Sequence, residues 1–177
     1  LYGILVQLLG RDQAFAVEDP GYPRLGKILD SCGVRICAIP MDASGVVPEL
    51  LEESGADILH ITPSHQFPTG IVMPISRRYE LLSWAAKDSA RYLIEDDYDC
   101  EFRLYGKPIP PLKSIDVLDQ VIYMNTFSKS LAPTFRISYM VLPKALAERF
   151  YEKLGFYSCS VSNFEQLTLA HFLGEGY

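Results

Sequence analysis

The residue types best suited to chemistry gather in one short segment of the chain, Asn125 to Arg136. Thr126 offers a hydroxyl group, Lys129 an amine, and Arg136 a planar guanidinium that suits a phosphate. A single lysine in a loop is usually solvated and inert, but this one lies among hydroxyls with an arginine seven residues later. A lysine amine can also form a covalent bond with a ligand. The segment therefore predicts a ligand site with Lys129 as its reactive group.

Apolar runs lead into and away from this segment, at residues 121–126 and 137–142. Both runs have the β-branched and aromatic content that is typical of buried strands. The segment therefore joins two strands through a turn of small polar residues. Folds that alternate strands and helices bind ligands at strand ends, so this turn lies where a ligand is expected.

A second candidate site is the acidic cluster Glu95 to Glu101, with five carboxylates in seven residues after a predicted strand at 92–96. The cluster lacks the alternating Asp/Asn pattern, the glycine and the distal glutamate of an EF-hand loop, which argues against a metal site. A solvated acidic turn is the plainer alternative. A carboxylate at a strand end also suits a protonated ring nitrogen, because a nearby anion stabilises that cation. We favour this last interpretation.

Two loops rich in proline and glycine follow two further predicted strands. The first, Asp19 to Arg24, follows a strand at 14–18 and carries Tyr22; the second, Thr62 to Gly70, follows a strand at 58–62. Proline and glycine prevent the strands from continuing, so both loops lie at a sheet end. A surface aromatic in the first loop and ordinary turn chemistry in the second are the plainer alternatives.

Strands and helices alternate along the chain, which predicts a three-layer α/β/α fold with a mostly parallel sheet and one antiparallel strand. At 177 residues, 49% of them hydrophobic, the chain is sized for one domain over residues 1–177. The predicted strands are 14–18, 34–39, 58–62, 92–96, 121–126 and 137–142. The predicted helices are 1–9, 25–31, 48–54, 76–89, 145–153 and 163–173, with Asn163 as the N-cap of the last.

Charge and composition exclude several classes of protein. Sixteen basic and 22 acidic residues give a net charge of −6 without a basic block, which argues against DNA binding by this segment itself. No apolar run approaches the roughly 18 residues of a membrane span, and no signal peptide is visible. The four cysteines form no Cys-x-x-Cys pair, so zinc is not indicated. These observations predict a cytoplasmic protein.

Four segments of the chain resemble a known family, and the first of them is Asp19 to Arg24, which is similar to a family segment with the pattern Glu/Asn-Pro-Gly-Tyr-Pro. Thr126 to Ile137 has the pattern Thr-Phe-Ser-Lys-Ser-Leu-x-Pro-x-x-Arg-Ile, Thr62 to Gly70 is Thr-Pro-Ser-His-Gln-Phe-Pro-Thr-Gly, and Glu95 to Arg103 is Glu-Asp-Asp-Tyr-Asp-Cys-Glu-Phe-Arg. They are similar to the aminotransferase-like domain of MocR/GabR-type bacterial transcription regulators, within the GntR superfamily. That domain has the large-domain fold of fold-type I pyridoxal-phosphate (PLP) proteins. The resemblance covers nearly the whole chain, with Cys100 where the family has serine.

The resemblance implies a role for each matching residue. Lys129 would form the Schiff base with PLP, Asp96 would face the protonated ring nitrogen, and Tyr98 would contact the phenolic oxygen. The other matching residues would bind ligand groups: the cofactor ring by Tyr22, the phosphate by Thr126 and Arg136, and an effector carboxylate by Arg24.

One position departs from working aminotransferases. There an asparagine precedes Pro-Thr-Gly and binds the phenolic oxygen of the cofactor, whereas Phe67 occupies that position here. Ser64, His65 and Gln66 are all candidates to replace the asparagine. The departure favours a regulator over a true aminotransferase.

The resemblance therefore implies a PLP-binding, effector-sensing domain of a transcription regulator, in which Lys129 exchanges its Schiff base with a small amino compound. The alternative is a true fold-type I PLP-dependent aminotransferase. A degenerate domain kept only for dimerisation is disfavoured, because Lys129, Asp96 and Arg136 are all present.

The resemblance also implies partners and missing parts. It implies a homodimer that contacts DNA only through a winged-helix domain outside this chain. An apolar helical pattern begins at Leu1 without a cap, so we expect a fragment: an incomplete large domain, with the winged-helix and small domains absent. Without the first strand of the family fold, strand 137–142 becomes a sheet edge.

Overall fold

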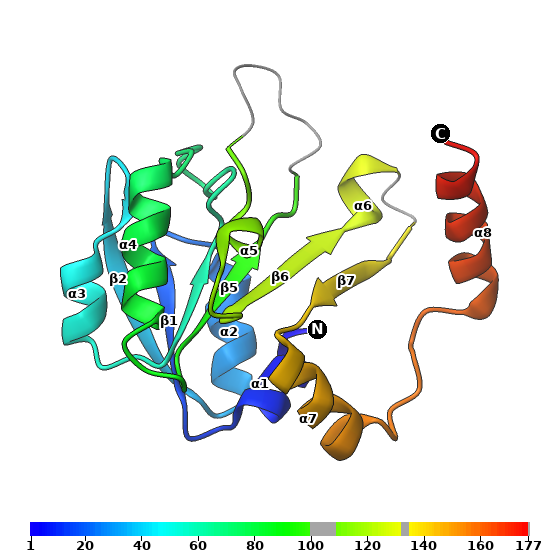
Figure 1. Ribbon diagram of the computed structural model, residues 1–177, viewed down its shortest axis with the longest axis horizontal. Helices are drawn as coiled ribbons and strands as arrows, with labels where there is room; N and C mark the ends of the chain where they lie inside the picture. The colour runs from blue at the N-terminus through cyan, green and yellow to red at the C-terminus, as the bar shows by residue number, and fades with distance from the viewer. Residues whose placement is uncertain (100–108, 132–134, 177) are drawn as a thin grey trace.

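The computed structural model describes residues 1–99, 109–131 and 135–176, and within them the strands form one sheet with helices on both sides (Figure 1). The strands are β1 (Ala14–Asp19), β2 (Arg35–Asp42), β3 (Gly45–Val46), β4 (Ile58–Ile61), β5 (Tyr92–Asp96), β6 (Val121–Thr126) and β7 (Ser138–Val141). The helices are α1 (Tyr2–Leu9), α2 (Pro23–Ser31), α3 (Pro48–Glu53), α4 (Ile75–Ala85), α5 (Leu112–Ile115), α6 (Phe127–Ser130), α7 (Lys144–Leu154) and α8 (Asn163–Gly174).

The sheet has the strand order β3-β2-β1-β4-β5-β6-β7. The neighbours from β2 to β6 are all parallel, and β6 and β7 are antiparallel. This order confirms the predicted three-layer, mostly parallel fold. Because β1 lies between β2 and β4, the chain reverses its direction across the sheet there. Open α/β sheets bind ligands at such a reversal, outside the carboxyl ends of the strands.

Each face of the sheet has its own hydrophobic core. Alternate strand residues such as Phe15 and Ile94 face α1, α2 and α7, whereas their neighbours Ala16 and Leu93 face α3, α4 and α5. This alternation follows from the two-residue repeat of a strand, which sends successive side chains to opposite faces. Helices therefore cover both faces of the sheet, so a ligand can reach the sheet only at the ends of its strands.

The structure differs from the predicted elements in three places. Gly45–Val46, which lies in none of the predicted strands or helices, forms β3 and pairs antiparallel with β2, so there are two antiparallel pairs and not one. The backbone of Gly45 has φ +106°, which allows the tight reversal. The turn after β6 contains the one-turn helix α6, and another one-turn helix, α5, was not predicted.

The N-cap of α8 is Ser162, so the prediction of Asn163 was wrong by one residue. The Ser162 hydroxyl accepts the amide proton of Glu165, and the Glu165 carboxylate accepts the amide proton of Ser162. A serine three residues before a glutamate forms this capping box, which explains the shift. The predicted helix 48–54 is present as α3, and Pro48 is its first residue.

Strand β7 lies at the edge of the sheet, as predicted, and most of its side chains are exposed. Figure 1 shows α8 beyond α6 and β7, reached by an extended segment after α7. Among the described residues, none of the helices has the length and hydropathy needed to cross a membrane.

Candidate functional site

The predicted site residues all lie at the carboxyl edge of the parallel strands. Tyr22 follows β1, Asp96 ends β5, and Lys129 follows β6 (Figure 1). Since β7 is antiparallel to β6, Arg136, just before β7, lies at the same edge. In the strand register Asp96 stands beside Met124, five residues before Lys129. The fold therefore brings residues that are far apart in sequence to one edge.

Asp96 is the most constrained of these residues. Its Oδ2 accepts a hydrogen bond of 2.6 Å from the Tyr2 hydroxyl and lies 3.5 Å from His60 Nε2. The Asp96 side chain is 23% exposed. Burial by itself raises the pKa of Asp96, but the hydrogen bonds and charge of His60 and the Tyr2 hydroxyl outweigh it, so the pKa is lowered. Asp96 is therefore an anion at neutral pH.

A second buried carboxylate, Glu18 at the end of β1, was not predicted as a site residue. Its Oε2 accepts hydrogen bonds from the Thr62 hydroxyl at 2.7 Å, the Thr62 amide at 3.2 Å and the Gln66 side chain at 3.3 Å. Its Oε1 is buried and has no hydrogen bond within the described part of the chain. Burial raises the pKa of Glu18 in spite of these donors. The site thus holds two buried carboxyl groups whose pKa values are shifted in opposite directions.

Of the three candidates to replace the missing asparagine, Gln66 already has hydrogen-bond partners in its own loop and in the loop after β1. Its amide nitrogen donates to Pro20 O at 2.9 Å and Phe67 O at 2.7 Å, and its Oε1 accepts from the Thr69 hydroxyl at 2.6 Å. Gln66 is buried, so it organises the loop and does not face a ligand. The exposed His65 and the half-buried Ser64 remain the candidates.

Tyr98 and His65 link the loop after β5 to the loop after β4. The Tyr98 hydroxyl donates to His65 O at 2.9 Å, and His65 Nδ1 lies 2.6 Å from Asp99 Oδ2. Burial and the charges of Asp99, Asp96 and Glu18 raise the pKa of Tyr98 to about 12, so it is a neutral phenol.

Tyr22 presents an accessible aromatic ring at this edge. The ring is 43% exposed and stands edge-on to Phe67, with 5.8 Å between the ring centroids. Phe67, at the position of the missing asparagine, thus contacts the aromatic residue expected to stack on a cofactor. Arg24 is exposed and lies in the first turn of α2, not in the preceding loop.

The turn that carries Lys129 is shaped by the hydroxyls before it. The Thr126 hydroxyl accepts the Ser128 amide proton at 3.2 Å and donates to Ile137 O at 3.2 Å, and the Ser128 hydroxyl donates to Phe135 O at 2.6 Å. These bonds tie the start of α6 to the strand that returns. The Thr126 hydroxyl, predicted to bind phosphate, is thus already engaged within the chain.

The basic groups of the site are open. Lys129 and Arg136 are both exposed. Within residues 1–99, 109–131 and 135–176, neither side chain makes a hydrogen bond or an ion pair. Two cations therefore stand at the sheet edge without an internal counter-ion, next to the strand that ends in Asp96.

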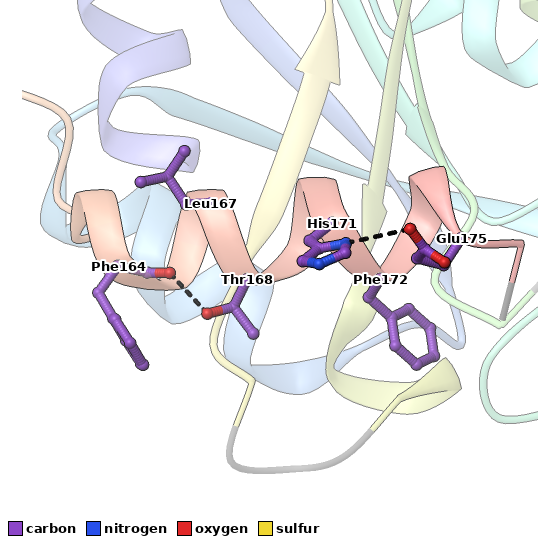
Figure 2. A pocket seen from close by; sticks show the side chains of 6 residues that line it. All are labelled: Phe164, Leu167, Thr168, His171, Phe172 and Glu175. Carbon is purple, nitrogen blue, oxygen red and sulfur yellow. Dashed lines mark hydrogen bonds and ion pairs between the residues drawn. The ribbon is translucent and has the colours of Figure 1, made fainter.

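Helix α8 lies against the lysine turn. A hollow of about 200 Å³ separates the turn from the helix and is lined by Leu131, Phe135, Thr168, Leu169 and Phe172. A neighbouring and largely exposed face of α8, which shares Thr168 and Phe172 with this hollow, holds none of the predicted site residues. Figure 2 shows the side chains along that face: Phe164, Leu167, Thr168, His171, Phe172 and Glu175.

Parts of two predicted motifs lie outside the described residues. They are Cys100, Glu101 and Arg103 of the acidic cluster and Pro133 of the lysine segment. Asp97, which precedes the first gap, is buried and accepts a hydrogen bond from the Tyr123 hydroxyl at 2.9 Å. In the part of the chain that is described, no group of three His, Cys, Asp or Glu side chains is arranged to hold a metal ion.

Sequence reasoning missed Tyr2, His60 and Glu18. Tyr2 and His60 lie inside an apolar helix and an apolar strand, where a polar residue gives no motif. The available signal was a polar side chain within an otherwise buried run, since such groups need a partner.

Comparison with known proteins gives curated relatives of two kinds. The HTH-type transcriptional regulator YdeL of Bacillus subtilis is 45% identical over 99% of this chain, and the pyridoxine biosynthesis regulator PdxR of Corynebacterium glutamicum is 35% identical over 98%. Aromatic-amino-acid aminotransferase 1 of Thermococcus litoralis is 34% identical over 91%. The chain spans 38% of the length of each regulator and 40% of the aminotransferase. No protein-family model matches it.

Among solved structures, the kynurenine aminotransferase of Pyrococcus horikoshii, determined in complex with PMP, has a TM-score of 0.86 and 29% identity. The match covers 99% of this chain and 46% of that one. The fold is therefore that of a PLP aminotransferase, of which this chain represents less than half.

Proposed function

Because this chain is a relative of MocR/GabR-type regulators of the GntR superfamily and has the fold of a PLP aminotransferase, we propose that it binds PLP and senses an amino compound. The complete protein is then a transcription regulator, and residues 1–177 form one incomplete domain of it. The sequence relation to HTH-type regulators supports the regulatory role, and the likeness to a PMP complex supports the cofactor.

One observation carries the proposal: an ionised, largely buried carboxylate, Asp96, ends the strand next to the one that delivers Lys129. An anion in that place suits a protonated ring nitrogen, and a nearby amine suits an aldehyde. Lys129 and Arg136, which have no ion-pair partner among the described residues, complement a phosphate in charge. The residues present therefore fit PLP.

When bound, PLP supplies an aldehyde for covalent attachment and a ring that withdraws electrons. The residues of this chain supply the rest. Lys129 provides the amine, Asp96 the counter-charge for the ring nitrogen, and Tyr98 a neutral hydroxyl for the phenolic oxygen. The remaining proposed contacts are Tyr22 with the ring, Arg136 with the phosphate, Thr126 with the phosphate once its hydroxyl releases Ile137 O, and Arg24 with the carboxylate of the amino compound.

Partners and setting follow from the same proposal. The ligand exchanged at Lys129 is a small amino compound, and DNA is bound by a winged-helix domain outside this chain. The protein acts in the cytoplasm as a homodimer. The net charge of −6 is consistent with a domain that does not itself contact DNA.

A true aminotransferase is the second candidate. The relation to the Thermococcus litoralis enzyme favours it. Against it, Phe67 packs on Tyr22 at the position where working aminotransferases use an asparagine, and Gln66 is occupied within its loop. We therefore favour the regulator.

The first test is covalent attachment to Lys129. In the complete protein, Lys129→Ala should abolish the absorbance of the bound cofactor and the adduct that borohydride reduction fixes on the chain. Lys87→Ala, on the exposed surface of α4–β5, is the matched control and should leave both unchanged. Mass spectrometry that finds the reduced adduct on another lysine would remove the assignment.

The second test concerns Asp96. Asp96→Asn keeps the shape but removes the charge, so it should weaken PLP binding and change the cofactor spectrum. Asp99→Asn is the matched control, because Asp99 contacts His65 on the loop. If Asp99→Asn has the larger effect on binding, the assignment of Asp96 is wrong.

The third test separates sensing from turnover. The complete protein is incubated with amino acids and a keto-acid acceptor while product and DNA affinity are followed. A sensor should change its DNA affinity with a particular amine and should not turn over efficiently. Multiple turnovers at ordinary enzyme rates, with DNA binding unaffected by every amine, would make the protein an aminotransferase.

A further inference from the structure

Three side chains from separate elements meet at Asp96. Tyr2 comes from α1, His60 from β4 and Asp96 from β5, and 58 and 94 residues of sequence separate Tyr2 from its two partners. The Tyr2 hydroxyl is 2.6 Å from Asp96 Oδ2 and 2.9 Å from His60 Nε2. A hydroxyl has one proton, which Tyr2 donates to the carboxylate. The Tyr2 oxygen is then an acceptor, so Nε2 of His60 carries a proton and donates it.

We infer that Tyr2 and His60 are positioning residues, which hold one oxygen of Asp96 and leave the other for a cationic group of a ligand. The identity of that group, the ring nitrogen of PLP, rests on the function proposed above. The arrangement of the three side chains does not depend on it.

The division of the carboxylate follows from the contacts. The Tyr2 hydroxyl donates to Oδ2, and His60 Nε2, which donates to the Tyr2 oxygen, lies 3.5 Å from the same Oδ2, whereas Oδ1 has no hydrogen bond within the described ranges. A carboxylate held through one oxygen cannot rotate freely about its last side-chain bond, so the second oxygen keeps a fixed direction. The partial exposure of the side chain leaves that oxygen open to the sheet edge.

The surrounding charges agree with this arrangement. Burial and the neighbouring Asp96 raise the pKa of Tyr2, so its hydroxyl stays protonated and remains a donor. The other titratable groups that act on the three side chains are Glu18, near His60, Tyr22, near Tyr2, and Tyr98, near Asp96. Tyr98 is a neutral phenol, so it does not compete with Asp96 for a cation, and burial raises the pKa of Glu18.

The test uses Tyr2→Phe in the complete protein, which removes the hydroxyl and keeps the buried ring. Two quantities are measured: the pKa of the Asp96 carboxyl by carbon NMR in cofactor-free protein, and the dissociation constant of PLP. We expect the pKa to rise and PLP to bind about tenfold more weakly, as for one hydrogen bond to a charged group. Tyr92→Phe, at the opposite end of β5, is the control and should change neither.

His60 gives a second pair of variants. His60→Leu removes the donor and should raise the Asp96 pKa and weaken PLP binding. His60→Gln keeps a donor near the position of Nε2 and should restore both toward the original values. This rescue separates a positioning role from mere packing, because leucine and glutamine both fill the space.

Each outcome decides the inference. If Tyr2→Phe lowers only the unfolding temperature and leaves the Asp96 pKa and the PLP dissociation constant unchanged, the contact is structural and the inference is overturned. If the unsubstituted protein does not bind PLP, the proposed function fails. In that case the NMR measurement alone decides whether Tyr2 and His60 hold the carboxylate.

Discussion

The acidic and basic halves of the candidate site differ in how far the chain itself fixes them. At the ends of β1, β4 and β5, the buried Glu18 and the partly buried Asp96 are held by hydrogen bonds from distant residues. After β6, Lys129 and Arg136 are exposed and make no hydrogen bond or ion pair in the described part of the chain. The difference shows which groups of the site are already held in place before a ligand binds. A ligand meets a preorganised anion but must itself order the cations.

The residue before Asp96 is Glu95, which forms a buried ion pair with Arg78. This pair supports the acidic half of the site from the other face of the sheet. Glu95 points to the other face of the sheet, where its carboxylate accepts the backbone amides of Leu112 and Lys113 at 2.8 and 3.0 Å. The fully buried Arg78 lies 3.7 Å from it and donates to Pro63 O and Pro110 O at 3.0 and 2.9 Å. This arginine ties α4 to the loops that follow β4 and precede α5. The lysine side has no such support among the described residues.

The largest effect is expected from breaking this support. Arg78→Met should destabilise the fold by about 3–5 kcal/mol, because it leaves a buried carboxylate and several buried carbonyls without their partner. Urea unfolding followed by circular dichroism measures the change. Lys87→Met, which breaks an exposed ion pair with Glu52, is the control and should leave the unfolding midpoint nearly unchanged. Equal effects of the two substitutions would contradict the special role of Arg78.

A smaller and pH-dependent effect is expected at Glu18. Its pKa in the folded chain is raised above the ordinary 4.5, so its contribution to stability is present below pH 4.5 and is lost as the pH rises through the folded value. Glu18→Gln keeps the acceptor for Thr62 and Gln66 without the buried charge. The stability of the original protein relative to this variant should therefore fall as the pH rises.

Asp96 should show the opposite sign. Its pKa is lowered below 3.8, so its contribution is present above that pH and is lost as the pH falls through the folded value. Thermal unfolding of Glu18→Gln and Asp96→Asn between pH 3 and 8 compares the two groups. If the stability difference between the original protein and each variant changes with pH in the same direction for both, the opposite pKa shifts of Glu18 and Asp96 are contradicted.

Helix α8, which lies against the lysine turn, allows a local test of the basic half. Ser162→Ala removes the N-cap and should cost the helix about 1 kcal/mol, whereas Asn163→Ala should cost little. Amide hydrogen exchange within α8 measures the difference. Faster exchange in Asn163→Ala than in Ser162→Ala would restore Asn163 as the cap.

The smallest effect on stability is expected at the basic residues themselves. Lys129→Ala and Arg136→Ala remove exposed side chains that have no partner in the described part of the chain, so the free energy of unfolding should change by no more than about 0.5 kcal/mol. The same substitutions should strongly reduce PLP binding if the proposed function is right. A large loss of stability in cofactor-free protein would show that Lys129 or Arg136 makes a stabilising contact within the protein.

The sequence alone determined that strands and helices alternate, and this alternation predicts a sheet of mostly parallel strands. It also located the groups at strand ends, because proline, glycine and small polar residues mark where each strand stops. The order of the strands then brings Tyr22, Asp96 and Lys129 to one edge, as any sheet of this topology must. These features depend on local patterns that repeat along the chain, so they can be read without coordinates.

Only the tertiary structure decided which side chains pair. The contacts of Tyr2 and His60 with Asp96, of Thr62 with Glu18, and of Arg78 with the loops join residues between 5 and 94 positions apart. Most of these residues interrupt apolar runs and carry no motif. Their partners depend on strand register and on the face of the sheet, and one residue of register moves a side chain to the opposite face. The sequence could therefore place Asp96 at a strand end, but the packing of α1 and β4 against that end decided how it is held.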